Sequence, residues 1–599
     1  MNTLGLSFDF HDASAALMCG GDLMATSAEE RFTLQKHDPS FPAHAAEWVL
    51  QHAQQQAGDV DVVAFYERPD EKFARVLHCG FERFPRGSAS FARAMKKWLG
   101  TTLWTRNHIA EQLGVSPKKI VCVPHHDSHV AQAFVESPFE SAAVLVVDGV
   151  GEWASTTLAV ASRAGGVKVL EQLDYPQSIG LVYAAFTAFL GFKPNSGEAS
   201  TMALAAFGEP RYVDEIVKVI RPLAGGHYAV DPDHFNFLAE DEQLFRPAFR
   251  RLFGEPRDVQ RRYPFDALRD EQVGVTELDR RHADIACSLQ LVLSEVLLGL
   301  CERLRLLTGE DKLCLAGGVA MNCLANTDIV RFSGFRHIFV PPDPGDGGAS
   351  VGAAALLSGM GRPRPRATPY LGPACDPAAV SALLEPGFLQ QLGNVNRTPG
   401  VPEVADMSVV RMEEGALVEW VAAALAQGQI VGWVQGRLES GPRALGNRSL
   451  LVDPANLDAV RRLSRTIKSH SHFRPYALSI AGEAAERILD CGFTSEPVLR
   501  WMQTIWPVRR QFHTLLRGGV HVDGTTRPQL VWRDDNPRYW MLLQAFERQS
   551  GLPVLLNTSF NERSMPMAGG APVALTTFLR TGMDAVVIGD TVLRKTWKR

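Results

Sequence analysis

The first apolar segments of the chain alternate with short polar turns. Residues 3–10 form an apolar run that contains Asp9, and a polar turn follows it. Residues 15–18 and 23–28 are apolar again and are separated by a Gly-Gly-Asp turn. Short apolar runs between turn signals are typical of β-strands joined as hairpins. We therefore expect a meander of three strands at the start of the chain, with Asp9 near the end of its first strand.

The same pattern recurs further along the chain. Residues 142–147 are an apolar run that ends at Asp148, and residues 155–161 and 167–173 flank a Gly-Gly turn. Two lobes built on such a repeat are the plan of the actin and sugar-kinase superfold, in which the aspartates after the two first strands face a shared cleft. Two unrelated meanders would give the same pattern, so the repeat alone leaves both interpretations open.

A long helix and a glycine-containing turn are predicted after the second meander. The amphipathic pattern over 281–307 predicts a helix, which the following Thr-Gly pair ends. A short strand over 313–316 leads into Gly317 and Gly318, and Asn322 lies at the start of the next helix. A strand, a glycine pair and a helix start are typical of a nucleotide cradle, although two glycines alone are a weak signal.

The length of the chain predicts several domains. At 599 residues it is too long for a single hydrophobic core. Prolines and glycines crowd residues 363–404, which predicts a linker. Residues 1–362 would then form the N-terminal domain, and residues 405–599 would form an α/β domain. Within the latter, the pattern predicts a helix over 415–427 and a strand over 430–434.

The overall composition narrows the class of protein. A formal net charge of −5 argues against a nucleic-acid-binding protein, which needs a basic face. The nine cysteines include no CxxC pair, which disfavours a cysteine zinc site and suits reduced thiols in the cytoplasm. The N-terminal segment lacks a basic region, so no signal peptide is predicted. Asp284 and Glu295 interrupt the most apolar stretch, which favours a buried helix over a membrane span.

Two histidines and two aspartates are candidate metal ligands. His125 and His129 would lie one turn apart on one face of a helix, a spacing that suits two imidazoles on one ion. Asp148 follows a predicted strand, and Asp346 lies in a glycine-rich turn that enters a helix. This donor set suits iron, manganese or zinc. The alternative is a pair of structural histidines on a helix.

His11 and its acidic neighbours are candidates for proton transfer. His11 and Asp12 follow the first strand, with Asp9 two residues before His11. A histidine at a strand end that faces a cleft is well placed to act as a general base or to position an acceptor. The alternative is a polar turn that closes the first hairpin, with Asp12 as its capping residue.

The C-terminal third combines arginines and glycines in short loops. Glycines allow a ligand to approach the backbone, and guanidinium groups match phosphate and carboxylate oxygens. This combination predicts a pocket for an anionic small molecule. A solvated basic helix over 461–468 would account for the arginines within it, but not for Arg443, which glycine and proline flank in a loop. The candidate residues here are Arg443, Arg448, Lys468, Arg474, Arg527 in a later turn, and Ser559 after an apolar strand.

Several motifs along essentially the whole chain resemble those of the O-carbamoyltransferases, the family that includes tobramycin carbamoyltransferase and the nodulation carbamoyltransferases. They occur in that family's order. They are FHDASAAL (10–17), EERFT (29–33), the HxxxH at 125–129, VDGVGE (147–152), GGVAMN (317–322), VPPDPGDGG (340–348), GRLESGPRALGNRSLL (436–451), Lys468 with Arg474, TTRPQ (525–529), NPRY (536–539) and LNTSFN (556–561).

The resemblance implies both a fold and a reaction. An actin/sugar-kinase-like N-terminal domain would be joined to a YrdC-like C-terminal domain. The YrdC-like domain would make carbamoyl-adenylate and pyrophosphate from carbamoyl phosphate and ATP, with Mg. The N-terminal domain would transfer the carbamoyl group to a hydroxyl of a small natural product, such as an antibiotic, beside a metal that in this family resembles an iron site. No nucleic acid or membrane partner is implied, and a homodimer stays open.

The resemblance also implies a role for each candidate residue. His11 would lie at the acceptor hydroxyl with Asp9 and Asp12 beside it, and Lys468 and Arg443 would act in adenylate formation. The metal ligands would be His125, His129, Asp148 and Asp346. The nucleotide and carbamoyl phosphate would be held by Arg443, Arg448, Lys468, Arg474, Arg527 and Ser559, with Gly317, Gly318 and Asn322 as nucleotide contacts in the N-terminal domain.

One departure from the family pattern concerns the N-terminal domain. The family commonly reads GKxMGLA where this chain has Ser200 in place of the lysine and Ala203 in place of a glycine. Phosphate contact by that loop is therefore in doubt, and a plain helix start is the alternative.

Other functions remain in competition with this one. They are carbamoylation of a protein thiol, whose enzymes carry CxxC zinc fingers that this chain lacks, synthesis of the tRNA threonylcarbamoyl modification, and a two-lobed sugar or acid kinase with an added binding domain. The acceptor is not readable from the sequence, and a nodulation-type lipo-oligosaccharide is an alternative to an antibiotic. Aromatic residues over 69–104 are candidates for a wall of the acceptor pocket, or for the packing of a helical insertion.

Overall fold

The chain folds into two compact units. The computed structural model describes residues 1–84, 88–237, 244–259, 261–269, 271–362, 367–375, 380, 398, 400–468, 473–492 and 497–598. Unit 1 consists of Met1–Glu29, Asp38–Tyr263 and Gly274–Ala367, and unit 2 of Glu30–His37, Pro264–Val273 and Thr368–Arg599. Unit 2 is thus not one continuous stretch of chain. Most of the predicted linker, 363–404, lies outside the described residues, and the domain boundaries stay predictions.

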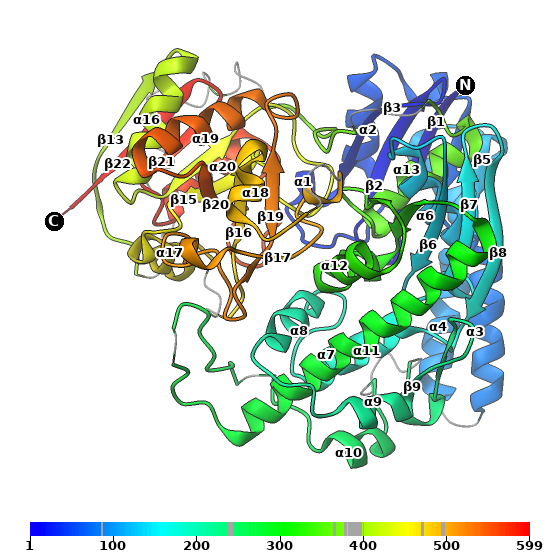
Figure 1. Ribbon diagram of the computed structural model, residues 1–599. Coiled ribbons are helices and arrows are strands. Elements are labelled where there is room, and N and C mark those ends of the chain that lie inside the picture. The colour runs from blue at the N-terminus through cyan, green and yellow to red at the C-terminus, as the bar shows by residue number, and fades with distance from the viewer. Residues whose placement is uncertain are drawn as a thin grey trace. The chain divides into compact units, whose positions relative to one another are not determined.

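Unit 1 contains two five-stranded sheets with the same topology (Figure 1). In the first sheet, the order is β3-β2-β1-β4-β5, with an antiparallel meander of β1 to β3 and with β4 and β5 parallel to β1. Its strands are β1 (Asn2–Ser7), β2 (Ser14–Cys19), β3 (Asp22–Ala28), β4 (Val62–Phe65) and β5 (Ile120–Cys122). The first strand ends at Ser7, earlier than predicted, so that Asp9 and His11 lie in the loop that follows.

The second sheet repeats this arrangement. Its order is β8-β7-β6-β11-β12, and β6 to β8 form the antiparallel meander while β11 and β12 run parallel to β6. Its strands are β6 (Ser141–Val147), β7 (Ala154–Ser162), β8 (Gly166–Asp174), β11 (Lys312–Ala316) and β12 (His337–Phe339). The predicted internal repeat is therefore confirmed, and so is a mixed α/β architecture.

Each sheet is followed by a helix, and the two helices pack together. Helix α6 (His125–Val135) follows β5, and helix α13 (Asp346–Ser358) follows β12. Glycines permit this close approach, because a Cβ at Gly352 would overlap the carbonyl oxygen of Ser128 on α6, and a Cβ at Gly348 would overlap the side chain of Gln132. The pair of helices therefore joins the two repeats of unit 1 through backbone contact.

The predicted long helix is α11 (Glu277–Thr308), which begins at a capping box formed by Thr276 and Asp279. It ends at Gly309, which adopts the left-handed conformation. Within the described residues, α11 is long and apolar enough to cross a membrane by length and composition alone. However, 67% of its apolar window is buried inside the protein, which is the behaviour of a core helix.

The aromatic stretch 69–104 forms a helical hairpin of α3 (Pro69–Arg83) and α4 (Ser88–Gly100) and a short turn after it. Phe73 and Trp98 pack between the two helices, with ring centroids 5.5 Å apart. Phe81, Phe84 and Trp104 are largely exposed. For Phe73 and Trp98, therefore, the structure favours packing of a helical insertion.

Unit 2 is built on an eight-stranded mixed sheet in the order β13-β22-β21-β14-β15-β20-β16-β19. These strands are β13 (Val404–Arg411), β14 (Val431–Val434), β15 (Arg448–Val452), β16 (Ala477–Ala481), β19 (Pro528–Val531), β20 (Val554–Ser559), β21 (Ala585–Ile588) and β22 (Thr591–Trp597). Helices α16 (Glu414–Ala426) and α19 (Pro537–Ser550) cover one face, where Trp433 is fully buried. The helix predicted over 415–427 and the strand predicted over 430–434 are confirmed.

Two local predictions in unit 2 need correction. The basic helix expected over 461–468 is instead the end of α17 (Leu457–Leu463) followed by a π-helical turn over Ser464–Lys468. Ser559 was expected to follow its strand, and it is instead the last residue of β20, at the strand end.

The glycine contact between α6 and α13 can be tested by substitution. We expect Gly352→Ala to lower the free energy of unfolding by about 1–3 kcal/mol or more, because the added methyl group would overlap the backbone of α6. The matched control is Gly100→Ala at the end of α4, where a Cβ has open space, and its effect should stay within about 1 kcal/mol. Urea unfolding followed by circular dichroism measures both, and equal midpoints would contradict the prediction.

Candidate functional site

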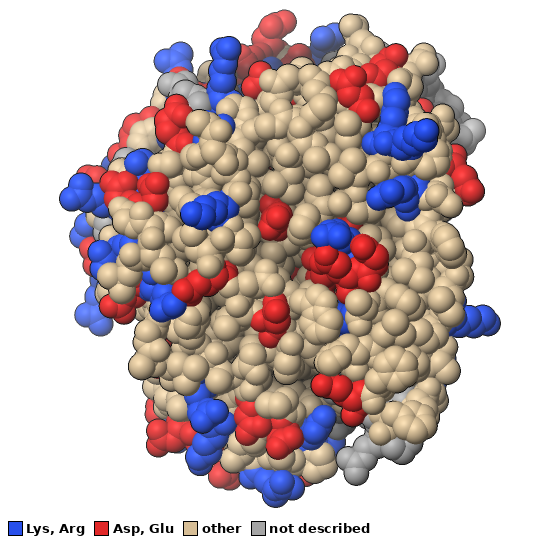
Figure 2. Space-filling model, turned by 90° about the vertical axis from the view of Figure 1, so that its right-hand side faces the viewer, with Lys and Arg blue, Asp and Glu red and all other residues tan. Residues whose placement is uncertain are grey.

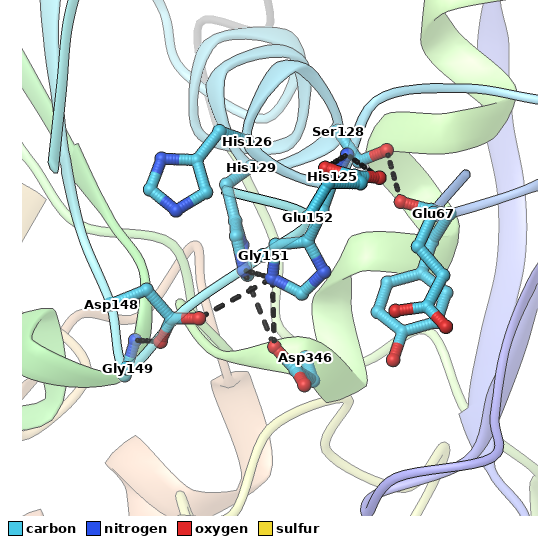
Figure 3. Close-up of polar contacts among 12 residues, drawn as sticks. Glu67, His125, His126, Ser128, His129, Asp148, Gly149, Gly151, Glu152 and Asp346 are labelled. Carbon is cyan, nitrogen blue, oxygen red and sulfur yellow. Dashed lines mark hydrogen bonds and ion pairs between the residues drawn. The ribbon is translucent and has the colours of Figure 1, made fainter. Parts of the chain in front are cut away.

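The repeat in unit 1 places the candidate metal ligands at equivalent positions. Asp148 follows β6 as His11 and Asp9 follow β1, and His125 and Asp346 are the first residues of α6 and α13. The helix N-terminus favours the negative charge of Asp346. Because α6 and α13 pack together, groups that are far apart in the sequence meet at one point, as Figure 3 shows.

Four donor atoms converge at this point. His125 Nε2 lies 3.1 Å from His129 Nε2, 3.3 Å from Asp148 Oδ2 and 3.6 Å from Asp346 Oδ1. His129 Nε2 lies 3.3 Å from Asp346 Oδ1. One ligand atom from each of the four residues lies within 4.8 Å of every other. Donors around a first-row ion, with bonds of about 2.0–2.2 Å, lie about 3.0–3.5 Å apart, which is close to the spacing of most of these pairs.

Neighbouring groups orient these side chains. His129 Nδ1 lies 3.2 Å from Gln132 Oε1, which can only accept, so Nδ1 carries the proton and Nε2 turns its lone pair to the cluster. The Gln132 amide donates in turn to the carbonyl of Asp343. The backbone N–H of Gly318 donates to Asp148 Oδ1 at 2.8 Å. The cluster is therefore positioned by fixed partners on both sides.

The electrostatics of the cluster favour a cation within it. Burial lowers the pKa of His125, but the carboxylates of Asp346 and Asp148 have the larger opposite effect and raise the pKa to about 9. Burial raises the pKa of Asp346 and Asp148, and the charge and hydrogen bonds of the histidines bring both below the ordinary range. His126, next to the cluster, differs, because burial and the charge of His125 lower its pKa to about 3.

His11 lies at the edge of the cluster. Its Nε2 is 4.0 Å from Asp346 Oδ2, and its Nδ1 is 2.8 Å from Asp12 Oδ2. Burial lowers the pKa of His11, whereas the hydrogen bond to Asp12 and the charge of Asp346 raise it to about 9. Asp9 points elsewhere, because its carboxylate accepts from Thr102 at 3.1 Å and pairs with Lys97 at 3.4 Å. The structure thus brings His11 and Asp12 to the cluster, and Asp9 to the α3–α4 hairpin.

The glycine turn predicted as a nucleotide cradle also borders the cluster. Gly317 adopts a positive φ, and a Cβ there would overlap the backbone of Val147. Gly318 bonds to Asp148, as described above. Asn322 caps α12 (Cys323–Phe332) and exchanges hydrogen bonds with Gln290 at 2.9 and 3.1 Å. These contacts are internal to unit 1 and shape the loop.

In unit 2, a buried carboxylate organises the loop with the sequence GPRALG, residues 441–446, which we call the GPRALG loop. Glu439 Oε1 accepts hydrogen bonds from the backbone N–H groups of Leu445, Asn447 and Arg448, at 2.7, 2.9 and 3.1 Å. The Arg448 side chain is fully buried and donates to the carbonyls of Gln435, Gly436, Asn447 and Pro373. The contacts of Arg448 are therefore those of a group that holds the loop in place.

Lys468 and Ser559 meet in unit 2. Lys468 Nζ lies 3.2 Å from Ser559 Oγ and 2.5 Å from Asn561 Oδ1. Burial, with the nearby charges of Lys36 and Arg474, lowers the pKa of Lys468 to about 7. The amine loses its charge as the pH rises through this value, and a bound anion would restore the charge. Nearby positive charges and burial both disfavour the charged form of a lysine, and an anion favours it.

Two of the predicted arginines lie in electrostatic contact. Desolvation by the surrounding protein and the charge of Arg443 lower the pKa of Arg474, part of which still reaches solvent. Arg443 and Arg527 are half-buried. Positive charges that lie close together are stabilised by an anionic ligand.

Comparison with known proteins decides the family. The model named carbamoyltransferase N-terminus matches residues 2–355, and the model named carbamoyltransferase C-terminus matches residues 422–595. The chain belongs to the carbamoyltransferase family.

Two named proteins are among the relatives of this carbamoyltransferase. Nodulation protein NolNO of Sinorhizobium fredii is 32% identical over 99% of this chain and 80% of its own length. The 3'-hydroxymethylcephem-O-carbamoyltransferase of Amycolatopsis lactamdurans is 27% identical over 97% of both chains. An uncharacterized Synechocystis protein is 36% identical over 99% of this chain and 96% of its own.

One of the similar solved structures matches part of the carbamoyltransferase. HypF of T. kodakarensis is 15% identical over 60% of this chain and 47% of that chain, with a TM-score of 0.29. A score at this level does not establish a common fold.

Three residues that hold the candidate site residues in place were not predicted from the sequence. Glu152 accepts from the backbone N–H of His125 at 3.1 Å and so caps α6. Gln132 orients His129, and Glu439 holds the GPRALG loop. Glu152 and Glu439 lie in the family motifs, whereas the only signal for Gln132 was its position one turn after His129 on the same helix.

The surface of the carbamoyltransferase carries both signs of charge. On the face drawn in Figure 2, basic and acidic side chains are interspersed rather than gathered by sign. This face therefore presents no surface of a single charge sign.

The role of Glu439 is testable by paired substitutions. We expect Glu439→Ala to lower the free energy of unfolding by more than about 2 kcal/mol, because three backbone donors lose their acceptor. Glu439→Gln keeps an acceptor oxygen and should lose less. Hydrogen exchange should speed up at residues 445–448 in the alanine variant alone, and similar exchange in both variants would contradict this role.

Proposed function

We propose that this carbamoyltransferase makes carbamoyl-adenylate in unit 2 and transfers its carbamoyl group to a hydroxyl in unit 1. The observation that carries the proposal is the four-donor cluster with His11 at its edge, in a chain whose unit 2 gathers cationic groups around the GPRALG loop. Unit 2 would then be the YrdC-like domain and unit 1 the actin/sugar-kinase-like domain. Relatives named for nodulation and for a cephem acceptor support a small hydroxylated acceptor.

In the first reaction, carbamoyl phosphate must lose its phosphate before the carbamoyl group can join AMP. When pyrophosphate leaves the α-phosphorus of ATP, the oxygen that replaces it must come from carbamate. Water therefore cleaves carbamoyl phosphate to carbamate and inorganic phosphate, and a carbamate oxygen then attacks the α-phosphorus. Pyrophosphate leaves with the bonding electron pair. One inorganic phosphate and one pyrophosphate are formed for each carbamoyl-adenylate.

The cationic residues of unit 2 suit this step. Carbamate and ATP are both anionic, so their approach needs fixed positive charge. Lys468, Arg443, Arg474 and Arg527 would supply it, together with the Mg that accompanies ATP, and Ser559 would donate its hydroxyl. We assign Arg448 to the support of the loop, because its guanidinium donates to four carbonyls.

The donor set of unit 1 fits a divalent metal ion. Two imidazole nitrogens and two carboxylate oxygens converge at spacings typical of donors around one ion, and Gln132 turns the lone pair of His129 to that point. His125, His129, Asp148 and Asp346 would hold the ion. Imidazole and carboxylate donors suit iron, manganese and zinc, and iron is our proposal on the family resemblance.

The second reaction transfers the carbamoyl group. The acceptor oxygen attacks the carbonyl carbon, AMP leaves with the electron pair of the broken C–O bond, and the hydroxyl proton passes to His11 Nε2. Asp12 holds His11 through Nδ1 at 2.8 Å and stabilises the imidazolium that forms. The metal ion, when bound, would polarise the carbonyl and offset the charge of Asp346, which favours the neutral, proton-accepting form of His11.

The unit 2 assignment predicts the loss of adenylate formation. Arg443→Ala or Lys468→Ala should lower carbamoyl-phosphate-dependent pyrophosphate release by roughly 10²-fold or more, since preorganised charge of this kind contributes about 2.7–4 kcal/mol. Arg461→Ala is the control, because Arg461 is an exposed residue of α17 that pairs with Asp458. Phosphate and pyrophosphate should appear in equal amounts. Full release by both variants would remove these residues from the site.

The unit 1 assignment predicts one metal ion per chain. His129→Ala removes one of four ligands and should sharply reduce metal content, measured by elemental analysis of the purified full chain. His126→Ala is a matched control, because His126 is equally buried on the same helix but bonds to Thr157 instead. Active wild-type protein without metal would contradict the assignment, as would equal losses in the two variants.

His11 separates the two reactions. We expect His11→Ala to leave pyrophosphate release nearly intact while acceptor carbamoylation falls by roughly 10²–10⁴-fold, the usual contribution of a general base. ATP consumption without carbamoylated product should appear. An equal fall in both activities would show that His11 is structural, and an unchanged rate would show that another group accepts the proton.

A further inference from the structure

Unit 1 contains a cavity outside the donor cluster. Its volume is about 330 Å³, at the low end of the range of about 300–1,000 Å³ for small-molecule sites. Aromatic rings supply much of its wall, and charged side chains lie among them. The lining residues are His78, Cys79, Glu82, Trp153, Tyr175, Pro176, Pro232, Phe235, Phe237 and Arg246.

A short loop connects the cavity to the donor cluster. Asp148 and Trp153 lie at the two ends of the loop between β6 and β7, which is closed by a hydrogen bond of 2.9 Å from Asp148 N to Ser155 O. Paired strand residues lie about 5.5 Å apart, and Trp153 is two residues from Ser155, or at most about 7 Å. The backbone of the cavity wall is thus within about 12 Å of a proposed metal ligand.

Helix α3 fastens the other wall to the same loop. Arg75 on α3 donates to the backbone carbonyls of Glu152 and Gly151. Cys79 and Glu82 follow Arg75 at spacings of four and seven, so that all three lie on one face of α3, and the last two line the cavity. Glu152 in turn bonds to the backbone N–H of His125. Cavity and cluster therefore share one rigid support.

The wall combines flat apolar surfaces with polar groups. Phe235 and Phe237 are stacked with centroids 5.0 Å apart, and the rings of Trp153 and His78 lie 5.7 Å apart. Glu82 pairs with His78 at 3.2 Å and Arg246 with Asp233 at 4.0 Å, and both pairs are exposed, so that a ligand can compete for these side chains at little cost. Aromatic faces contact the flat side of a ring, and these polar groups can bond to hydroxyls on its edge.

We propose that this cavity binds the acceptor through a hydroxylated six-membered ring of the glycosyl type, which stacks on Trp153. The ring would present its edge hydroxyls to Glu82 and Arg246. The proposal rests on the proposed function, since it assigns the acceptor class of the same transferase. It also places the specificity of the enzyme on the α3 wall of the cavity.

Binding can be measured without knowledge of the natural acceptor. The probes are methyl pyranosides of glucose, galactose, mannose and N-acetylglucosamine, with cyclohexanol as the ring that lacks the additional hydroxyls. Saturation-transfer NMR on the full chain should show ring-proton contact for at least one pyranoside and a several-fold weaker signal for cyclohexanol. Absence of every pyranoside signal, or a preference for cyclohexanol, would overturn the proposal.

Variants locate the bound ring. Trp153→Ala and Glu82→Gln should each reduce the pyranoside signal several-fold, while Phe81→Ala, on the exposed face of α3, should not. Glu82 is a surface residue, so its variant should fold even if Trp153→Ala does not, and Trp153→Phe keeps a stacking ring. Two results would place the ring elsewhere. One is an equal signal in all variants, and the other is a loss of signal in Phe81→Ala alone.

The proposed function is tested separately by carbamoyl-phosphate-dependent pyrophosphate release. Release by wild type without pyranoside binding would overturn the cavity assignment alone. Pyranoside binding that depends on Trp153, in a protein without such release, would overturn the proposed function and leave the cavity as a glycosyl site.

Discussion

The close packing of α6 on α13 is the contact on which unit 1 depends. Each helix follows the last strand of one sheet, and glycines of α13 allow its backbone to reach that of α6. This contact brings the first residues of both helices together, so that His125 and Asp346 meet although 220 positions separate them. A side chain between the helices would separate the two halves of the cluster. Packing and chemistry are therefore set by the same few backbone atoms.

The pattern of the sequence predicted the repeat and most of the donor cluster for physical reasons. The apolar run before Asp148 predicts a strand end there, and helical spacing predicts that His125 and His129 share one face. Both are local signals that the sequence contains. Asp9 was misplaced as a neighbour of the cluster, since its orientation depends on the insertion that contains Lys97 and Thr102, about 90 residues away. Arg448 was read as a ligand contact because residue type alone does not show that four carbonyls surround its guanidinium.

The two units treat charge in opposite ways. In unit 1, each buried carboxylate of the cluster faces a histidine, so the groups compensate one another and hold fixed positions. In unit 2, the buried carboxylate of Glu439 accepts from backbone N–H groups, and the charge of Arg443 helps to lower the pKa of Arg474. A cluster of mixed charge suits a small cation, and a group of neighbouring cations suits an anion. The two units therefore differ in the kind of charge that surrounds their candidate residues.

The discontinuity of unit 2 has a consequence for biosynthesis. Arg31, in a short segment from the start of the chain, donates to the carbonyl of Gly441 at 3.1 Å, across 410 positions of sequence. Contacts of such separation form late, because the chain must close a very large loop. The ribosome must release most of the polypeptide before this segment can find its partners. Unit 2 therefore matures only at the end of synthesis, and a chain truncated at either end would lack part of it.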